Sequence, residues 1–428
     1  MLYCGTAVRS ITPDYPVALG GYAARWGKKS VGVHDDIFVK AFFLTDETNK
    51  ILLIFADVEG LTEELLSPVR ERIAKELGIL NVSFSATHTH SAPHTFPQVQ
   101  LPEDEMDLEW VEALRQKLFE VAKSATDDLF SAALGYGNAT VPEVAHNRRK
   151  GQTITDPALS VLWFQDQAGD VRGILLSYTC HCTVLDGNSF LVSSDYPGSI
   201  YREMSKKYPQ AVCAFANGCA GDINIGYSSD ASALGETMTI RTFEIAEKIG
   251  RLLASRAVST IEKADAKEDL TVQMETHRVL LPLRQNLPTE EEIWARIHAV
   301  DRETAYCGDP ERLRVLRLKK IYMQSLVLRL HGLTAQDRFI PADVVFFRIG
   351  GRIYITAPGE LFAESGLILK ERFSARFDPV ILGYSNGYVG YLPPASAMEA
   401  GGYEAETSVF ANHAADMLID QISNIRPF

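Results

Sequence analysis

Residues 82–90 are Val82-Ser83-Phe84-Ser85-Ala86-Thr87-His88-Thr89-His90, a short apolar run followed directly by two histidines. The run has the length and residue types of a buried β-strand, and the polar residues after it mark its end. Five more apolar runs rich in β-branched residues share this character, at 51–56, 173–178, 212–216, 353–356 and 380–383. We expect these strands to form the central sheets of the protein.

Helical patterns lie between the predicted strands. Residues 110–125 place apolar side chains on one stripe, and residues 68–77 begin with Pro68 in the first turn and Ser67 in a capping position. The alternation of strands and helices predicts an α/β fold in which mixed central β-sheets are flanked by helices.

One charge-dense segment, at about 286–332, differs from the rest of the chain. Its apolar residues follow helical spacing without a convincing strand pattern: Ile293, Ile297, Leu313, Val315, Leu316, Ile321 and Leu326. This pattern predicts a helical insertion. Because no internal repeat or low-complexity linker marks a boundary, we expect one domain over residues 1–428.

Composition and charge limit the classes of partner. Of the 428 residues, 46% are hydrophobic and 23% are charged, which is typical of a globular protein. The net charge of −13 opposes binding to nucleic acid or to an anionic membrane surface. No stretch approaches the roughly 18 apolar residues of a membrane span, and no basic segment precedes an apolar run at the N-terminus. We therefore expect a cytoplasmic protein without stable membrane insertion, whose oligomeric state the sequence leaves open.

The six cysteines are too few and too scattered for a disulfide scaffold, so we expect reduced thiols. The segment Cys180-His181-Cys182 resembles a metal motif. Neighbouring residues of a strand point to opposite faces, however, so these three side chains are not expected to converge on one ion.

Three of the ten histidines, His88, His90 and His94, fall within seven residues. In an extended His-x-His segment both imidazoles point to one side, so one can bind a metal ion while the other transfers a proton. The alternative is an exposed polar loop that contains histidines by chance, and this alternative is favoured for His94 alone.

Other candidates follow other predicted strands. His181 lies just beyond the strand at 173–178, and the polar turn at 193–198 could line the same cleft. Glu360 follows a strand, a proline and a glycine, a rigid exit that would fix a carboxylate in position. Alternatively, Glu360 lies in the first turn of a helix at 361–370, where its charge favours the helix dipole.

Tyrosines gather after the strand at 380–383, where Tyr388 and Tyr391 are followed by Tyr403. Buried tyrosines usually serve packing, so these residues alone do not indicate a metal site. Candidate groups nevertheless stand at the carboxyl ends of four different strands, where α/β proteins form their binding sites. We expect a metal site at these strand ends.

Taken in order, several separated motifs resemble those of the neutral ceramidase family, zinc amidases that hydrolyse the N-acyl bond of ceramide. The segment Ala86 to Pro93 is similar to the family's Gly-Thr-His-Thr-His-Ser-x-Pro, and Asn147-Arg148-Arg149 is similar to its Asn-Arg-Ser. The other matching segments are His181 with Ser193-Ser194-Asp195, Pro358-Gly359-Glu360, Asn386-Gly387-Tyr388-Val389-Gly390-Tyr391, Gly21-Tyr22 and Gly32-Val33-His34-Asp35. The resemblance covers nearly the whole chain.

The resemblance implies a Zn2+ site with four ligands, which would be His88, His181, Glu360 and Tyr391. It also implies that His90 and Tyr403 lie near the reacting carbonyl and that Arg148 contacts the substrate. We therefore expect a zinc-dependent hydrolase in which an activated water attacks the amide carbon–nitrogen bond of a small N-acyl substrate. His90 would transfer the proton, while Tyr403 and Arg148 would stabilise the oxyanion.

Two features depart from the family pattern. Members that act on ceramide carry an active-site serine where this chain has Asn224. Asparagine can hydrogen-bond but cannot act as a nucleophile, so we expect Asn224 to orient water or a polar group of a substrate other than ceramide. The chain also ends at Phe428, without room for the C-terminal immunoglobulin-like domain of those enzymes, so we expect a short member of the family.

Several alternatives stay open on the sequence alone. The same metal chemistry would serve an esterase or a lactonase. A non-catalytic binding protein is a further interpretation, which the convergent ionisable groups disfavour. Imidazole and oxygen ligands also suit manganese or iron. Asp57 and Asp195 are candidates to accept hydrogen bonds from the ligand histidines.

Overall fold

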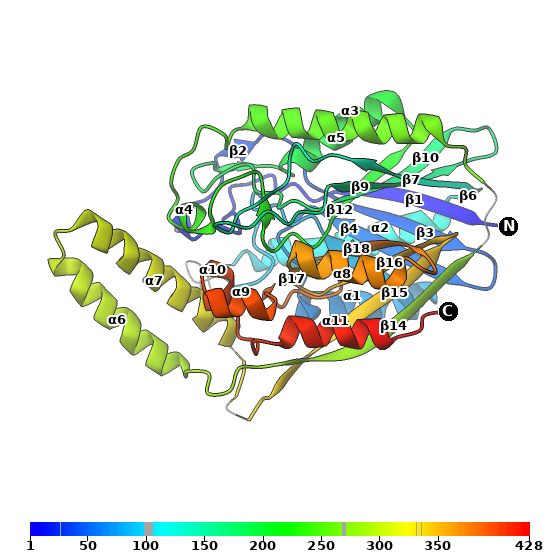
Figure 1. Cartoon of the computed structure of the whole chain (residues 1–428). Helices are drawn as coiled ribbons and strands as arrows, with labels where there is room; N and C mark the ends of the chain where they lie inside the picture. Colours follow the sequence, from blue (N-terminus) through cyan, green and yellow to red (C-terminus); the bar gives the residue numbers. More distant parts are fainter. Residues whose placement is uncertain (26, 98–105, 268–270, 331, 335) are drawn as a thin grey trace.

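The computed structural model describes residues 1–25, 27–97, 106–267, 271–330, 332–334 and 336–428. Its longer strands form three mixed sheets, each with one parallel pair of strands (Figure 1). The strand order in sheet 1 is β5 (Asn81–Ala86), β4 (Lys50–Ala56), β3 (Phe38–Thr45), β1 (Tyr3–Ser10) and β6 (Leu129–Ser131). The order in sheet 2 is β12 (Val212–Asn217), β10 (Val171–Tyr178), β9 (Ala158–Gln165) and β7 (Ala133–Thr140). The order in sheet 3 is β14 (Val272–Pro282), β15 (Phe339–Ile349), β16 (Arg352–Thr356) and β18 (Asp378–Leu382).

The six strands predicted from sequence are the members of the three parallel pairs: β4 with β5, β10 with β12, and β16 with β18. Parallel strands are usually buried on both faces, so they stand out in a sequence as continuous apolar runs. The strand β14 was not predicted, because its side chains alternate between buried and exposed positions and it ends in a proline. The predicted α/β fold with mixed sheets is confirmed.

Helices cover the outer faces of the sheets (Figure 1). Sheet 1 carries α1 (Glu63–Leu77) and α2 (Leu108–Asp127), sheet 2 carries α3 (Tyr196–Lys207) and α5 (Phe243–Lys263), and sheet 3 carries α8 (Ala363–Phe373) and α11 (Ala414–Asn424). The short helices are η1 (Ala23–Arg25), α4 (Ser229–Ala233), α9 (Ala395–Ala400) and α10 (Tyr403–Glu406). The short strands pair as β2 (Gly32–Val33) with β11 (Leu191–Val192), β8 (His146–Asn147) with β13 (Ile223–Asn224) and β17 (Glu360–Leu361) with β19 (Tyr391–Leu392). None of the helices in the described ranges is long and apolar enough to cross a membrane.

The helical insertion is confirmed as two long helices, α6 (Glu290–Tyr306) and α7 (Pro310–Leu330), which project from the rest of the molecule (Figure 1). Of its predicted bounds, residue 331 lies outside the described residues. Thr289 caps α6 through a reciprocal pair of hydrogen bonds with Glu292, which explains why the helix begins there. The apolar residues Ile293, Ile297 and Leu316 are buried, whereas Val315 is exposed.

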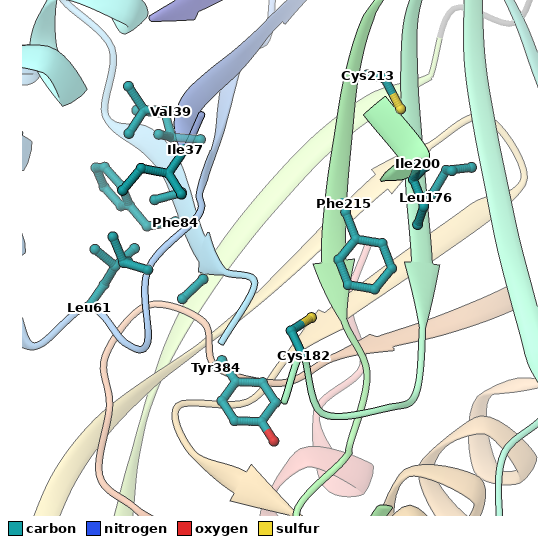
Figure 2. Packing of buried hydrophobic residues seen from close by; sticks show 14 of the residues in the cluster. Ile37, Val39, Leu61, Phe84, Leu176, Cys182, Ile200, Cys213, Phe215 and Tyr384 are labelled. Carbon is teal, nitrogen blue, oxygen red and sulfur yellow. The ribbon is translucent and has the colours of Figure 1, made fainter. Parts of the chain in front are cut away.

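A shared apolar core holds the three sheets together. Phe42 of sheet 1, Phe164 of sheet 2 and Phe347 of sheet 3 belong to one buried cluster. A second cluster joins sheets 1 and 2 near their carboxyl ends, and Figure 2 shows Phe84 on one side of it and Phe215 on the other. The parallel pairs of sheets 1 and 2 are therefore held by both clusters, whereas that of sheet 3 joins them through the shared core.

The predicted start of the first long helix is wrong. α1 begins at Glu63 with Thr62 as its cap, and Pro68 lies inside the helix instead of in its first turn. A proline at this position leaves the Glu64 carbonyl without its helical partner. Arg115 of α2 donates a hydrogen bond of 3.4 Å to that carbonyl, which compensates for the loss. In contrast, α2 has the predicted buried stripe, Val111, Leu114, Leu118 and Val121.

A buried ion pair links sheet 1 to α3. Lys40 Nζ on β3 lies 3.0 Å from Asp57 Oδ2, just after β4, and both side chains are less than 5% exposed. Tyr201 of α3 donates its hydroxyl to Asp57 Oδ1 at 2.8 Å, and Ser194 donates to Oδ2 at 3.2 Å. Asp57 therefore does not accept a hydrogen bond from a histidine, and the prediction of that role for it is wrong.

Replacing Lys40 by methionine should lower the free energy of unfolding by about 3–5 kcal/mol, because it leaves Asp57 as a buried charge without its cation. Urea denaturation measures this change. Lys117→Met is the matched control, since the ion pair of Lys117 with Glu120 lies on the surface and should contribute less than about 1 kcal/mol. Equal losses in the two variants would contradict the structural role of Lys40.

Candidate metal centre

Three side chains from three different sheets meet at one point. His88 follows β5 of sheet 1, His181 follows β10 of sheet 2, and Glu360 follows β16 of sheet 3. One potential ligand atom from each lies within 4.8 Å of the other two, and the three side chains are 1% exposed. Glu360 belongs to β17 and precedes α8, so the alternative in which it sits in the first turn of a helix is wrong.

Backbone carbonyls fix the orientation of both imidazoles. His88 Nδ1 lies 2.6 Å from the Glu59 carbonyl oxygen, and His181 Nδ1 lies 3.0 Å from that of Ile223. A carbonyl oxygen only accepts hydrogen bonds, so each Nδ1 carries the hydrogen and each Nε2 presents its lone pair. The Nε2 atoms of His88 and His181 lie 3.6 and 3.1 Å from Glu360 Oε2. Two imidazole nitrogens and one carboxylate fit a zinc-type cation.

Electrostatics favour the charge states that a metal ion requires. Burial lowers the pKa of His88 to about 3, so its imidazole is neutral at pH 7. Burial alone would raise the pKa of Glu360, but the neighbouring His88 and His181 and the hydrogen bond from Tyr388 outweigh it and hold this pKa at about 2. A neutral imidazole and an ionised carboxylate are the forms that bind metal.

His88 also has a strained backbone, with φ at 64°, in a region that favours glycine. Its amide donates to the Val58 carbonyl at 3.0 Å, and its ring stacks on Tyr384 with 4.1 Å between ring centroids. The surrounding contacts therefore hold His88 in a conformation that an isolated chain would avoid, as is common at functional sites.

His90 lies beside His88, with 3.1 Å between their Nε2 atoms. Its Nδ1 is buried and has no hydrogen-bond partner among the described residues. Gly21 packs against the ring: its φ is 87°, and a Cβ there would lie only 2.2 Å from His90 Cγ. Burial lowers the pKa of His90 well below its ordinary value. His94 is buried and lies outside the metal group. The alternative of an exposed polar loop is therefore wrong for His94.

The tyrosine motif contributes more than the one residue predicted as a ligand. Tyr388 donates its hydroxyl to Glu360 Oε1 at 2.6 Å, and Tyr384 lies 3.5 Å from Oε2. Tyr391 is the register partner of Glu360 in the parallel pair of β17 and β19. Sequence reasoning missed the contacts of Tyr384 and Tyr388 with Glu360, although both residues stand in or next to the motif that was singled out.

Arg148 lies next to Tyr391, to whose hydroxyl its Nη2 donates at 3.0 Å. Its Nε donates at 2.8 Å to Glu404, a buried carboxylate that sequence reasoning missed although it follows Tyr403 directly. The Tyr391 and Tyr403 rings meet edge to face, with centroids 5.6 Å apart. Arg148, Tyr391 and Tyr403 line a cavity of about 570 Å³. The same cavity is lined by His88, His90, His181 and Glu360.

Two other predicted roles are wrong. Asn224 does not line the cavity: its Nδ2 donates to the Tyr227 carbonyl at 2.8 Å, and its Oδ1 accepts from two backbone amides of the same turn. The amide of Asn224 is therefore used to build a loop. Asp195 caps α3 and accepts from the Leu185 amide, so it does not orient a ligand histidine either. The six cysteines are free, and the metal group of the described chain contains none of them.

Tyr388→Phe should weaken metal binding by about 10- to 100-fold, because it removes the hydroxyl that holds Glu360 in place. Competition with a zinc-sensitive dye measures this affinity. Tyr208→Phe is the control, since the Tyr208 hydroxyl has no hydrogen-bond partner in the described parts of the chain. An unchanged affinity in Tyr388→Phe would mean that Glu360 is positioned without this hydroxyl.

Known proteins share both sequence and fold with this chain. Neutral ceramidase from Drosophila melanogaster is 28% identical over 223 residues, which cover 45% of this chain and 32% of that protein. Neutral ceramidase from Pseudomonas aeruginosa is 25% identical over 232 residues, which cover 49% of this chain and 34% of that protein. The matched region thus spans about a third of the length of these relatives.

Solved structures extend the likeness to the whole fold. The crystal structure of neutral ceramidase from Pseudomonas aeruginosa has a TM-score of 0.76 at 19% identity and covers 99% of this chain and 73% of that one. A ceramidase complexed with C2 gives a TM-score of 0.74 at 17% identity, with 99% and 74% covered. The family model described as neutral/alkaline non-lysosomal ceramidase, N-terminal, matches residues 3–231. Because that match spans more than half of the 428 residues, the chain belongs to the neutral/alkaline non-lysosomal ceramidase family.

Proposed function

We propose that this chain is a single-domain, zinc-dependent amidohydrolase that cleaves the carbon–nitrogen bond of a linear N-acyl substrate. One observation carries the proposal: two imidazoles with carbonyl-fixed tautomers and one ionised carboxylate meet, fully buried, at the wall of a cavity. Relatives named neutral ceramidases support the amide bond as the target. The serine of family members that act on ceramide stands here as Asn224, whose amide is used within its own turn, and this difference favours a substrate other than ceramide.

The residues proposed to hold the ion are His88, His181 and Glu360, with Tyr391 as the fourth ligand. Tyr391 is included because its register places it beside Glu360 and because Arg148, which donates a hydrogen bond to its hydroxyl, opposes the burial that raises the pKa of Tyr391. When bound, the ion supplies Lewis-acid activation of water and of the substrate carbonyl.

His90 is proposed to move the proton. Burial lowers its pKa, so the imidazole is neutral and keeps a nitrogen lone pair that can accept a proton from the attacking water. Its Nε2 lies 3.1 Å from His88 Nε2, beside the proposed reacting centre. The water oxygen bonds to the carbonyl carbon, the carbon–nitrogen bond breaks, and the proton passes from His90 to the leaving amine. Arg148 and Tyr403 donate hydrogen bonds to the oxyanion that forms before the bond breaks.

An ester or a lactone would use the same residues, because the attack on the carbonyl is the same. The amide is preferred here on the names of the relatives alone. A cytoplasmic location and a lack of nucleic-acid partners remain predictions from the sequence.

Metal analysis of protein purified without added metal or chelator tests the centre. Wild-type protein should contain about one zinc ion per chain, and His88→Ala and Glu360→Ala should lose it because each removes a ligand. His90→Ala should keep the metal but lose hydrolysis of an amide and ester panel. His277→Ala should change neither property, because His277 lies on β14 and pairs with Glu275, outside the cavity.

Each outcome bears on a different part of the proposal. Wild-type protein that neither contains nor takes up zinc on titration would overturn the metal-dependent mechanism. Unchanged hydrolysis in His90→Ala would remove His90 from the proton transfer. A metal-loaded protein that cleaves no amide or ester would support the interpretation as a binding protein.

A further inference from the structure

The helical insertion forms one wall of the cavity beside the metal centre. From α7, Ile321, Ser325, Leu328 and Arg329 line the cavity. The Tyr322 ring meets that of Tyr403 edge to face at 5.6 Å, and its hydroxyl bonds to Asp230 of α4. These contacts tie α7 to residues that surround the proposed reacting centre, so the insertion shapes the space that a substrate would enter.

Arg329 carries the only cavity-lining guanidinium of the described chain that lacks an ion pair. Its Nη2 donates to the Tyr388 hydroxyl at 3.3 Å, and this is its single hydrogen bond among the described residues. The guanidinium lies against Gly390, whose φ is 85°, and a Cβ at that position would come within 3.0 Å of Arg329 Nε. Arg148, the other arginine among the described residues that line the cavity, instead forms an ion pair with Glu404, which it shares with Arg149.

Arg329 forms no ion pair with another residue in the described part of the chain. Burial opposes this charge, but Tyr388 and Glu360 outweigh it and raise the pKa of Arg329, and Glu59 acts in the same direction. Glu360 pairs with the two imidazoles and the Tyr388 hydroxyl instead, and it forms no ion pair with Arg329 within 4.0 Å. A half-buried cation without a paired anion is costly, and a guanidinium has five N–H donors in a planar fork that matches a carboxylate.

We propose that Arg329 binds a carboxylate on the amine portion of the substrate, which makes N-acylated amino acids the substrate class of this site. The inference rests on the proposed amide hydrolysis. Only the Tyr388 hydroxyl separates Arg329 from Glu360, so a carboxylate held there lies close to an amide at the metal centre. The acyl chain occupies the apolar part of the cavity, which includes Ile321, Leu328 and Phe96.

The reaction balances without another reactant. The oxygen of one water bonds to the acyl carbon, the carbon–nitrogen bond breaks, and the nitrogen takes up the proton. The products are a fatty acid and a free amino acid. Arg329 holds the carboxylate of the amino acid throughout and takes no part in bond making or breaking, so it is a residue of specificity and positioning.

The first test compares N-octanoylglycine with N-octanoylglycinamide, which differ only in the charged group. Zinc-loaded wild-type protein should show a kcat/KM about 10- to 100-fold higher for the carboxylate, the range expected for a hydrogen bond to a charged group. Arg329→Gln should lose this preference through slower cleavage of the carboxylate substrate alone. Arg329→Lys, which keeps the charge but not the fork, should retain part of it.

Arg314→Gln is the matched control on the same helix. Arg314 pairs with Glu236 and does not line the cavity, so the preference should persist in this variant. Metal content and thermal unfolding of every variant identify any that has lost zinc or failed to fold. Equal kcat/KM for the two substrates in wild-type protein, or the same preference in Arg329→Gln, would overturn the carboxylate site while leaving the hydrolase intact.

A binding measurement separates this inference from the hydrolysis itself. The keto analogue of N-octanoylglycine, in which a methylene group replaces the amide N–H, has no carbon–nitrogen bond to cleave. By calorimetry it should bind wild-type protein about 10- to 100-fold more tightly than its primary amide does, and Arg329→Gln should remove the difference. This result without any hydrolysis would refute the proposed function but support the carboxylate site. Equal binding of both analogues would refute the carboxylate site.

Discussion

The buried carboxylate of Glu360 is the constraint on which the centre of this molecule depends. A carboxylate at 1% exposure is unfavourable unless hydrogen bonds and cations surround it. Here the Tyr388 hydroxyl donates to it, and the Nε2 atoms of His88 and His181 face it from two other parts of the chain, so a cation bound between them would complete its surroundings. The three sheets must therefore end at one place, and their shared core of large aromatic side chains holds them there.

The strained backbone near the centre depends on the same packing. His88 has a positive φ, and Gly21 lets the His90 ring approach closer than any side chain would permit. Such local costs persist only where the surrounding structure fixes the residue from several sides. The buried ion pair of Lys40 and Asp57, close to the end of β4, contributes to this rigidity by joining sheet 1 to α3.

The helical insertion, α6 and α7, forms one wall of the cavity beside the candidate metal centre. Through Tyr322 it contacts Tyr403, and through Arg329 it contacts Tyr388, which in turn holds Glu360. A helix that reaches the metal centre through one hydroxyl can change which molecules fit the cavity without changing the proposed ligands. The proposed ligands and the proposed carboxylate site therefore lie on different elements.

The sequence by itself determined the parallel strands, the helical insertion and the cluster of His88 and His90, because periodicity and strand ends are local properties. It did not determine the carbonyl partners of His88 and His181, which lie 29 and 42 residues away. Nor did it determine the contact between His181 and Glu360, which are 179 residues apart. It also misplaced Asn224, whose amide is used in a local turn, and it left Arg329 unnoticed on a charge-dense helix. Only tertiary structure decided these points, because contacts between distant residues depend on how three separate sheets pack against one another.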